Sequence, residues 1–131
     1  MKFALCNEVL QHLSLEDGFA KIAEIGYHGV EIAPFTLKEN PLEIDESDAD
    51  RCIEAAKSAG IEIVGLHWLM AKSEGLHLTH PDEGMRTAAC EYLKKLTLLT
   101  ARMSGNIMVL GSPQQRNLEH GPPYEEAFDR A

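Results

Sequence analysis

Short apolar runs alternate with amphipathic stretches along the chain, and a glycine stands at each transition from amphipathic to apolar. The apolar runs cover residues 30–33, 61–66 and 107–110, and the glycines before them are Gly26, Gly60 and Gly105. Glycine readily takes the left-handed conformation that ends many helices, and apolar runs of this length are typical of buried strands. The pattern therefore predicts a helix, a glycine stop and a strand, repeated along the chain. Because each helix carries the chain back before the next strand begins, the strands are predicted to run parallel.

The first part of the chain fits the same pattern. Residues 3–6 read as the first strand, and the helix after it is predicted to begin at Ser14, with Asp17 three positions later in a capping-box arrangement. The second helix is predicted to be capped by Asp45 or Ser47, in an acidic segment that suits the positive end of a helix dipole.

The longest amphipathic stretch begins at Pro81 and keeps helical spacing as far as Met103, and another helix is predicted from Tyr124. Four parallel strands with three complete crossover helices fit a small flavodoxin-like sheet or about half of a (β/α)8 TIM barrel. The flavodoxin-like sheet normally has a fifth strand, and 131 residues are roughly half of the ~250 in a typical barrel. We therefore interpret residues 1–131 as a single α/β domain that forms the amino-terminal half of a TIM barrel. The open edges of such a half are expected to be covered by a further part of the protein or by a second copy.

Charge and cysteine content narrow the function classes. The formal net charge is −9, and Lys and Arg are not clustered, whereas binding to a phosphate backbone uses clustered cations. No run approaches the roughly 18 apolar residues of a membrane span. The three cysteines, Cys6, Cys52 and Cys90, have no CxxC spacing. An odd number of widely spaced cysteines predicts reduced thiols and a cytoplasmic protein rather than a disulfide framework.

Candidate functional residues follow the predicted strands, because parallel α/β folds bind ligands at the carboxyl ends of their strands. The candidates for substrate binding are Asn7, Glu31, His67, Trp68, Ser112 and Arg116. His67 combines hydrogen bonding with acid–base chemistry near neutral pH, and a structural role at the strand end is the alternative. Glu31 lies within a predicted strand, where a carboxylate needs a partner, either a cation or the site itself.

The remaining candidates supply a stacking face and a loop. Trp68 offers a flat apolar surface to a ligand, with plain packing as the alternative. Residues 111–117 combine backbone amides with the guanidinium of Arg116, which suits an anionic or polyhydroxylated substrate, although an ordinary turn has the same pattern. The spacing is not that of a P-loop. Direct metal ligation is a further alternative for His67, whereas no metal-ligand spacing is found for His12, His28, His77, His80 and His120, so no metal ligand is assigned.

Three segments together resemble a known family. They are residues 25–32 (IGYHGVEI), 59–67 (AGIEIVGLH) and 109–113 (VLGSP), the last followed by Arg116. In this order at strand ends they resemble the amino-terminal half of the xylose-isomerase-like sugar phosphate isomerases and epimerases, and the resemblance covers almost the whole chain. It implies a TIM barrel whose first half lines the substrate pocket. The positions that the resemblance carries over as possible site residues are Asn7, Glu31, His67, Ser112 and Arg116.

The resemblance also implies a chemistry. Members typically bind one divalent metal (manganese, magnesium or zinc) through Glu, Asp, His and Glu on strands of the second half. Two of those glutamates move a proton between adjacent carbons of the sugar. By this resemblance the chain belongs to a metal-dependent sugar or sugar-phosphate isomerase or epimerase, and its catalytic residues and metal ligands are expected beyond residue 131. Residues 1–131 alone are therefore expected to be inactive.

The expected partners are a small sugar or sugar phosphate, and either a missing carboxyl-terminal half or a second copy, with no nucleic acid and no membrane. The alternative is a non-catalytic binding module, flavodoxin-like or a self-associating half barrel. A base-repair nuclease on the same barrel would need basic loops and further histidines at strand ends, and the sequence has neither.

Overall fold

One parallel sheet organises the molecule. The computed structural model describes residues 1–119 and 123–130. The strands are β1 (Ala4–Cys6), β2 (Gly29–Ile32), β3 (Glu62–His67) and β4 (Ile107–Val109). They pair in the order β1-β2-β3-β4, and every pair is parallel. A flavodoxin-like sheet would place its strands in the order 2-1-3-4-5, so the sequential order confirms the half-barrel interpretation over that alternative.

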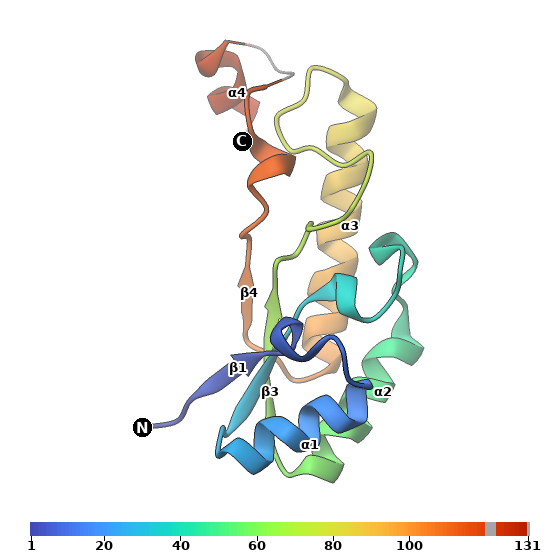
Figure 1. The fold of residues 1–131 in the computed structure, drawn as a ribbon. Helices are drawn as coiled ribbons and strands as arrows, with labels where there is room; N and C mark the ends of the chain where they lie inside the picture. Colours follow the sequence, from blue (N-terminus) through green and yellow to red (C-terminus); the bar gives the residue numbers. More distant parts are fainter. Residues whose placement is uncertain (120–122, 131) are drawn as a thin grey trace.

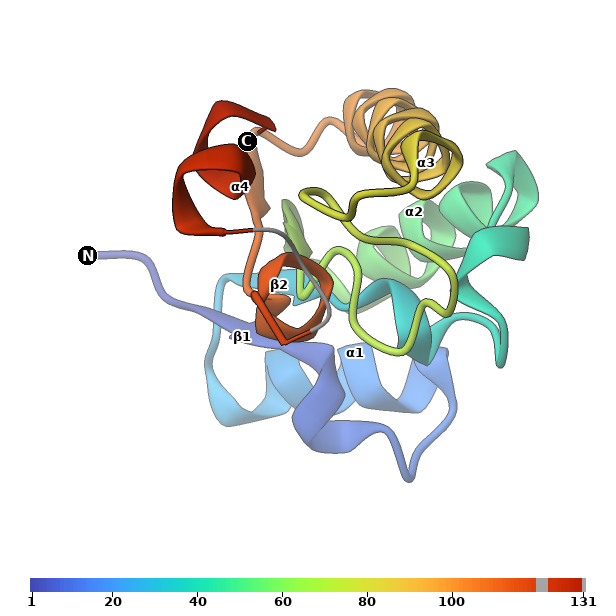
Figure 2. The ribbon, with the colours of Figure 1, turned by 90° about the horizontal axis from the view of Figure 1, so that it is seen from above.

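Three helices connect successive strands, as predicted. The helices are α1 (Leu15–Ile25), α2 (Glu46–Ala59), α3 (Glu83–Arg102) and α4 (Tyr124–Arg130). Short 3-10 turns are η1 (Asn7–Leu10), η2 (Pro34–Thr36), η3 (Pro41–Glu43) and η4 (Pro113–Arg116). The loops after β3 and β4 rise toward the same end of the molecule (Figure 1), and α1, α2 and α3 follow one another along one side of the sheet (Figure 2). Within the described residues, no helix combines the length and apolar character needed to cross a membrane.

The first two helix ends follow the predicted chemistry. The Ser14 hydroxyl accepts the backbone N–H of Asp17 at the start of α1, and Asp45 forms a capping box with Asp48 at the start of α2. Gly26 and Gly60 end these helices in the left-handed conformation, with φ of 102° and 70°. Each glycine lets the chain reverse sharply into the next strand, because it bears no Cβ that would oppose a positive φ.

The third repeat ends differently from the prediction. Ser104, with a φ of 59°, takes the left-handed conformation after α3, and Gly105 does not. Gly105 is required for another reason: a Cβ at this position would lie 3.0 Å from Cα of Gly65 and 3.1 Å from Cγ2 of Thr100. The glycine that precedes β4 therefore permits a close approach of two backbone segments rather than a turn.

The hydrophobic core lies between the sheet and the helices. Its fully buried side chains include Phe19 and Ile22 of α1, Val30 and Ile32 of β2, and Leu96 of α3. On the opposite face of the sheet the side chains are more exposed, as shown by Ile107, which is 46% exposed. In a closed barrel this open face would line the interior, so the fold is that of a half barrel whose inner surface is accessible.

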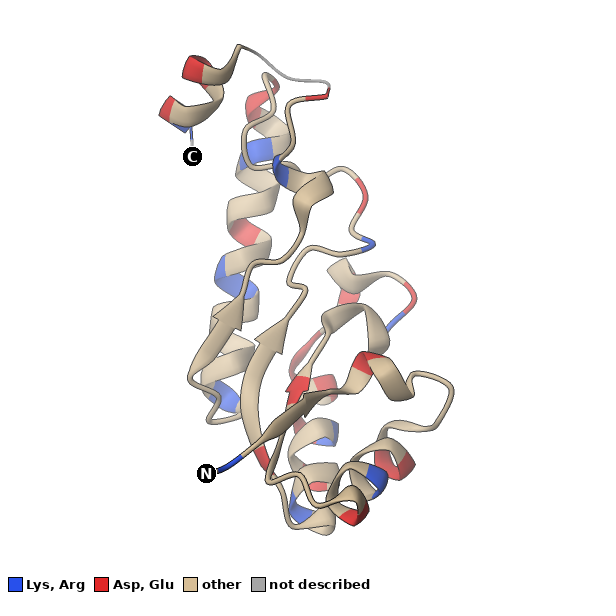
Figure 3. Ribbon diagram, turned by 60° about the vertical axis from the view of Figure 1, so that its left-hand side comes forward, with Lys and Arg blue, Asp and Glu red and all other residues tan. Residues whose placement is uncertain are grey.

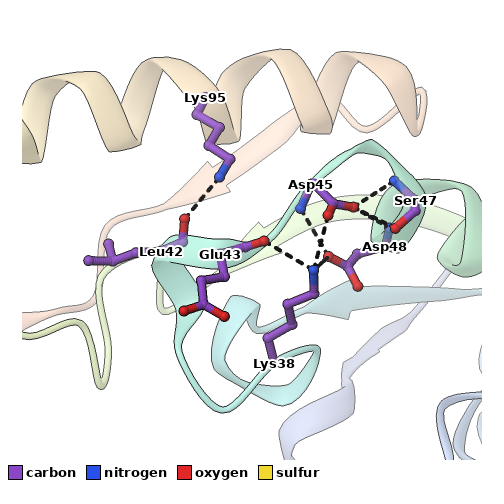
Figure 4. Close-up of polar contacts among 7 residues, drawn as sticks. All are labelled: Lys38, Leu42, Glu43, Asp45, Ser47, Asp48 and Lys95. Atoms are coloured by element: carbon purple, nitrogen blue, oxygen red, sulfur yellow. Dashed lines mark hydrogen bonds and ion pairs between the residues drawn. The ribbon is translucent and has the colours of Figure 1, made fainter.

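The long connection between β2 and α2 is fastened by two lysines. Nζ of Lys38 lies 3.1 Å from a carboxylate oxygen of Asp45 and 3.0 Å from one of Asp48, whose side chain is buried. Lys95 of α3 donates to the carbonyl oxygen of Leu42 at 2.9 Å (Figure 4). These contacts join the loop that follows β2 to the start of α2 and to α3.

The negative charge of Asp45 contributes to stability, and the pH dependence of the stability tests this contribution. Hydrogen bonds from Ser47, and then from the Lys38 ammonium, hold the pKa of Asp45 well below its ordinary value. A depressed pKa stabilises the fold above the unfolded-state pKa of about 4, and this stabilisation is lost as the pH falls through the folded-state pKa. Replacing Asp45 with Asn keeps a capping oxygen and removes the charge. Asp45→Asn should therefore be less stable than the parent protein at about pH 7, and the difference should narrow as the pH falls below about 4.

Urea unfolding midpoints measured across that pH range check this expectation. Glu54→Gln is the matched control, because Glu54 is an exposed residue of α2, the helix that Asp45 caps. A stability difference for Asp45→Asn that stays constant with pH would show that the carboxylate charge contributes nothing.

Candidate active site

A β-bulge turns His67 to the open face of the sheet. The pairs on the two sides of the bulge are Val30 with Ile63 and Glu31 with Gly65. Val64 is therefore an extra residue in β3, and a one-residue shift moves every later side chain to the other face. As a result Leu66 enters the core, and His67 comes to lie on the same face as Glu31. Without the bulge, His67 would point toward the helices.

Glu31 and His67 form a hydrogen-bonded pair on this open face. Nδ1 of His67 lies 2.9 Å from Oε2 of Glu31, and the two side chains are 29% and 26% exposed. Gly65, which lies opposite Glu31 in the register, has no side chain, so the carboxylate can reach diagonally to His67. Charged residues otherwise lie mainly on helices and loops, and the strands carry few of them (Figure 3). The partner predicted for Glu31 is thus a member of the candidate site itself.

Trp68 packs beside this pair in a strained conformation. Its ring lies 5.7 Å from that of His67 with an interplanar angle of 18°, so the two rings stack. The backbone of Trp68 has a φ of 56°, which is costly for a bulky side chain, and such strain is concentrated at functional sites. A Cβ added to Gly111 would lie 3.5 Å from Cε3 of the indole. The loop after β4 therefore approaches the indole of Trp68 closely.

Cys6 of β1 borders the pair. It lies opposite Glu31 in the β1–β2 register. Burial raises the pKa of the Cys6 thiol to about 11, and the nearby carboxylates of Glu8 and Glu31 act in the same direction. A raised pKa favours the thiol over the thiolate, which is the nucleophilic form of cysteine.

Asn7 and Ser112 join neighbouring loops at the carboxyl edge of the sheet. The Asn7 side chain is buried; Oδ1 accepts the N–H of Ala33 at 2.9 Å, and Nδ2 donates to the hydroxyl of Thr36 at 2.7 Å. The Ser112 hydroxyl, 1% exposed, accepts the N–H of Met70 at 2.9 Å. Substrate contact by these two residues stays a prediction, and their observed contacts give each a supporting role.

Removing the Ser112 hydroxyl should destabilise the protein. In Ser112→Ala the buried N–H of Met70 loses its acceptor, and an unsatisfied buried donor costs about 1–3 kcal/mol. We expect the free energy of unfolding in urea to fall by that amount. Ser58→Ala, at an exposed position of α2, is the matched control and should change it by less than about 0.5 kcal/mol. Equal stabilities of the two variants would contradict a bridging role for the hydroxyl.

Arg116 is carried by a turn that is anchored to the β3–α3 loop. Its side chain is exposed and makes no hydrogen bond or ion pair with residues 1–119 or 123–130. The anchor includes a hydrogen bond of 2.8 Å from the N–H of Leu78 to the carbonyl oxygen of Gln115. His77 is buried in the same region and accepts the N–H of Thr79 at 3.3 Å. The sequence carries no signal that His77 is buried. Its burial depends on a loop some 40 residues later in the chain, where Asn117 contacts its ring.

The described residues do not by themselves form a metal centre. In residues 1–119 and 123–130, no group of three or more His, Cys, Asp or Glu side chains is placed to hold a metal ion. Glu31 and His67 form a pair of such groups, and Cys6 lies opposite Glu31 on the neighbouring strand. The site therefore supplies hydrogen bonding, an acid–base pair and an aromatic face.

Comparison with known proteins places this chain in a family. The family model described as "Xylose isomerase-like TIM barrel" matches residues 19–131. No curated protein sequence matches the chain. Among solved structures, the crystal structure of D-psicose 3-epimerase in the presence of D-fructose is similar, with a TM-score of 0.70 and 15% sequence identity. The similarity covers 99% of this chain and 44% of that chain, so this chain spans less than half of the epimerase. The chain belongs to the xylose isomerase-like TIM barrel family.

Proposed function

We propose that this chain is part of a metal-dependent isomerase or epimerase that moves a proton between adjacent carbons of a sugar or sugar phosphate. The chain would supply one wall of the substrate pocket. The observation that carries the proposal is the Glu31–His67 pair beside Trp68 at the carboxyl ends of the strands, in a chain of the xylose isomerase-like family. An aromatic face next to groups that donate and accept hydrogen bonds suits a sugar, which has apolar C–H faces and hydroxyl edges.

The metal in this proposal would be manganese, magnesium or zinc. It would polarise the carbonyl and hydroxyl oxygens of the sugar when bound. Because the described residues hold no cluster suited to it, its ligands would come from strands that this chain does not contain. His67 and Glu31 would then bind and orient the sugar from the opposite wall. A cytoplasmic location is part of the same proposal, and the three unpaired cysteines support it.

Sugar binding can be followed through Trp68, because it is the single tryptophan of the sequence. We expect D-fructose or D-psicose to change the Trp68 emission with saturation. His67→Ala should weaken that binding by about tenfold or more, the equivalent of one hydrogen bond of about 1.4 kcal/mol. His12→Ala, an exposed histidine outside the site, is the matched control.

Assays of sugar conversion test the reaction. With Mn²⁺ present, the complete barrel should interconvert D-fructose and D-psicose, whereas a polypeptide of residues 1–131 should bind the sugar without converting it. If neither sugar nor its phosphate ester changes the emission, or if His67→Ala binds as tightly as the parent protein, the proposed pocket is wrong.

A further inference from the structure

We propose that Glu31 is a positioning residue, which holds His67 with its proton on Nδ1 so that Nε2 accepts a hydrogen bond from a ligand hydroxyl. This inference rests on the proposed function for the identity of the ligand. The arrangement of the two side chains stands independently of that function.

His67 and Glu31 share one proton in their hydrogen bond. Nδ1 of His67 lies 2.9 Å from Oε2 of Glu31. An ionised carboxylate only accepts hydrogen bonds, so Nδ1 must be the donor. In a neutral imidazole with its proton on Nδ1, Nε2 carries a lone pair and acts as an acceptor. A carboxylate that orients a histidine in this way is a common supporting arrangement in protein sites.

The other ring nitrogen of His67, Nε2, is accessible. Among residues 1–119 and 123–130, no group hydrogen-bonds to Nε2 of His67, and this atom is not among the buried polar atoms that lack a partner. It is therefore open to solvent or ligand. Glu31 likewise makes no ion pair with a lysine or arginine in the described chain. The carboxylate is thus directed to His67 rather than to a cation.

The imidazole ring of His67 is held in one orientation by its neighbours. The β-bulge at Val64 brings His67 to the face of Glu31, and the indole of Trp68 stacks on the imidazole at an interplanar angle of 18°. The indole of Trp68 also lies close to the backbone at Gly111. A ring that is stacked on one face and hydrogen-bonded at Nδ1 has little freedom to turn, so Nε2 has a fixed direction.

The tautomer is directly measurable in the protein by long-range ¹H–¹⁵N correlation spectra of ¹⁵N-labelled histidines near neutral pH. We expect the proton of His67 on Nδ1. Glu31→Ala should shift the proton to Nε2, which free imidazole prefers, whereas Glu31→Gln should keep it on Nδ1, because an amide oxygen still accepts. Glu62→Ala is the matched control, since Glu62 is an exposed β3 residue that pairs with Lys2. Backbone amide spectra of each variant verify that it is folded.

D-fructose binding, followed through Trp68 emission, tests the consequence. Affinity should fall about tenfold or more in Glu31→Ala and stay within about threefold in Glu31→Gln and Glu62→Ala. A proton on Nε2 in the parent protein, or protons on both nitrogens, would overturn the proposal. Equal losses in Glu31→Ala and Glu31→Gln would overturn it too, because they would assign the effect to charge. If the proton is on Nδ1 but neither D-fructose nor D-psicose binds, the sugar function fails and the positioning of His67 by Glu31 stands.

Discussion

Replacing Gly65 with alanine should lower the free energy of unfolding by at least about 3 kcal/mol. This is among the largest effects expected from adding a single methyl group to this protein. A Cβ at Gly65 would overlap the carbonyl oxygen of Ile107 and lie 2.7 Å from its carbonyl carbon. Backbone atoms cannot rotate away as a side chain does. Since Gly65 and Ile107 are direct partners in the β3–β4 register, the two strands would have to separate.

Urea unfolding of Gly65→Ala measures this loss, and Gly18→Ala is its matched control. A Cβ at Gly18, inside α1, would meet nothing closer than Cβ of Leu10 at 3.9 Å. Alanine is the better helix former, so Gly18→Ala should stabilise the protein by about 0.5–1 kcal/mol. A Gly65→Ala protein as stable as its parent would mean that β3 and β4 do not approach as closely as described.

The glycines also show how far the sequence specifies the fold. Gly26 and Gly60 follow a local rule, since an apolar stripe, a glycine and an apolar run predict a helix, a left-handed stop and a strand. The number, direction and helical connection of the strands were predictable for that reason. Gly65 and Gly105 follow no local rule. Each is required by the backbone of another segment, and that requirement is visible only once β3 and β4 lie side by side.

The candidate site also has features that the sequence predicts and features that it does not. Its location at strand ends follows from the fold class, which is why Glu31, His67 and Trp68 were identifiable as candidates. Their contact was less predictable, because it depends on the bulge at Val64. The apolar positions Ile61, Ile63 and Leu66 do carry a trace of the bulge, since the spacing changes from two residues to three. The burial of His77 has no such local signal, because it depends on contacts with residues some 40 positions later in the chain, such as Asn117.

Two leucines of α3 allow the contribution of core burial to stability to be measured. Leu96 is 1% exposed and belongs to the core, whereas Leu98, two positions later, is 74% exposed. Both changes to alanine remove the same atoms from the same helix. Leu96→Ala should reduce the free energy of unfolding by about 2–5 kcal/mol, through lost burial and the cavity that remains. Leu98→Ala should change it by less than about 0.5 kcal/mol, because Ala and Leu are both good helix formers.

Leu96→Ala should fall toward the upper part of that range. Leu96 already borders a small apolar cavity, whose other walls include Pro34, Leu66 and Leu99. Neighbours that leave this space unfilled are not expected to collapse into a larger one, and the cost of truncation rises with the volume that stays empty. Urea unfolding of the two variants, at equal protein concentration, measures the difference. Comparable losses in both would place Leu98 in an interface of the folded protein, and comparable small changes would mean that α3 does not pack on the sheet as described.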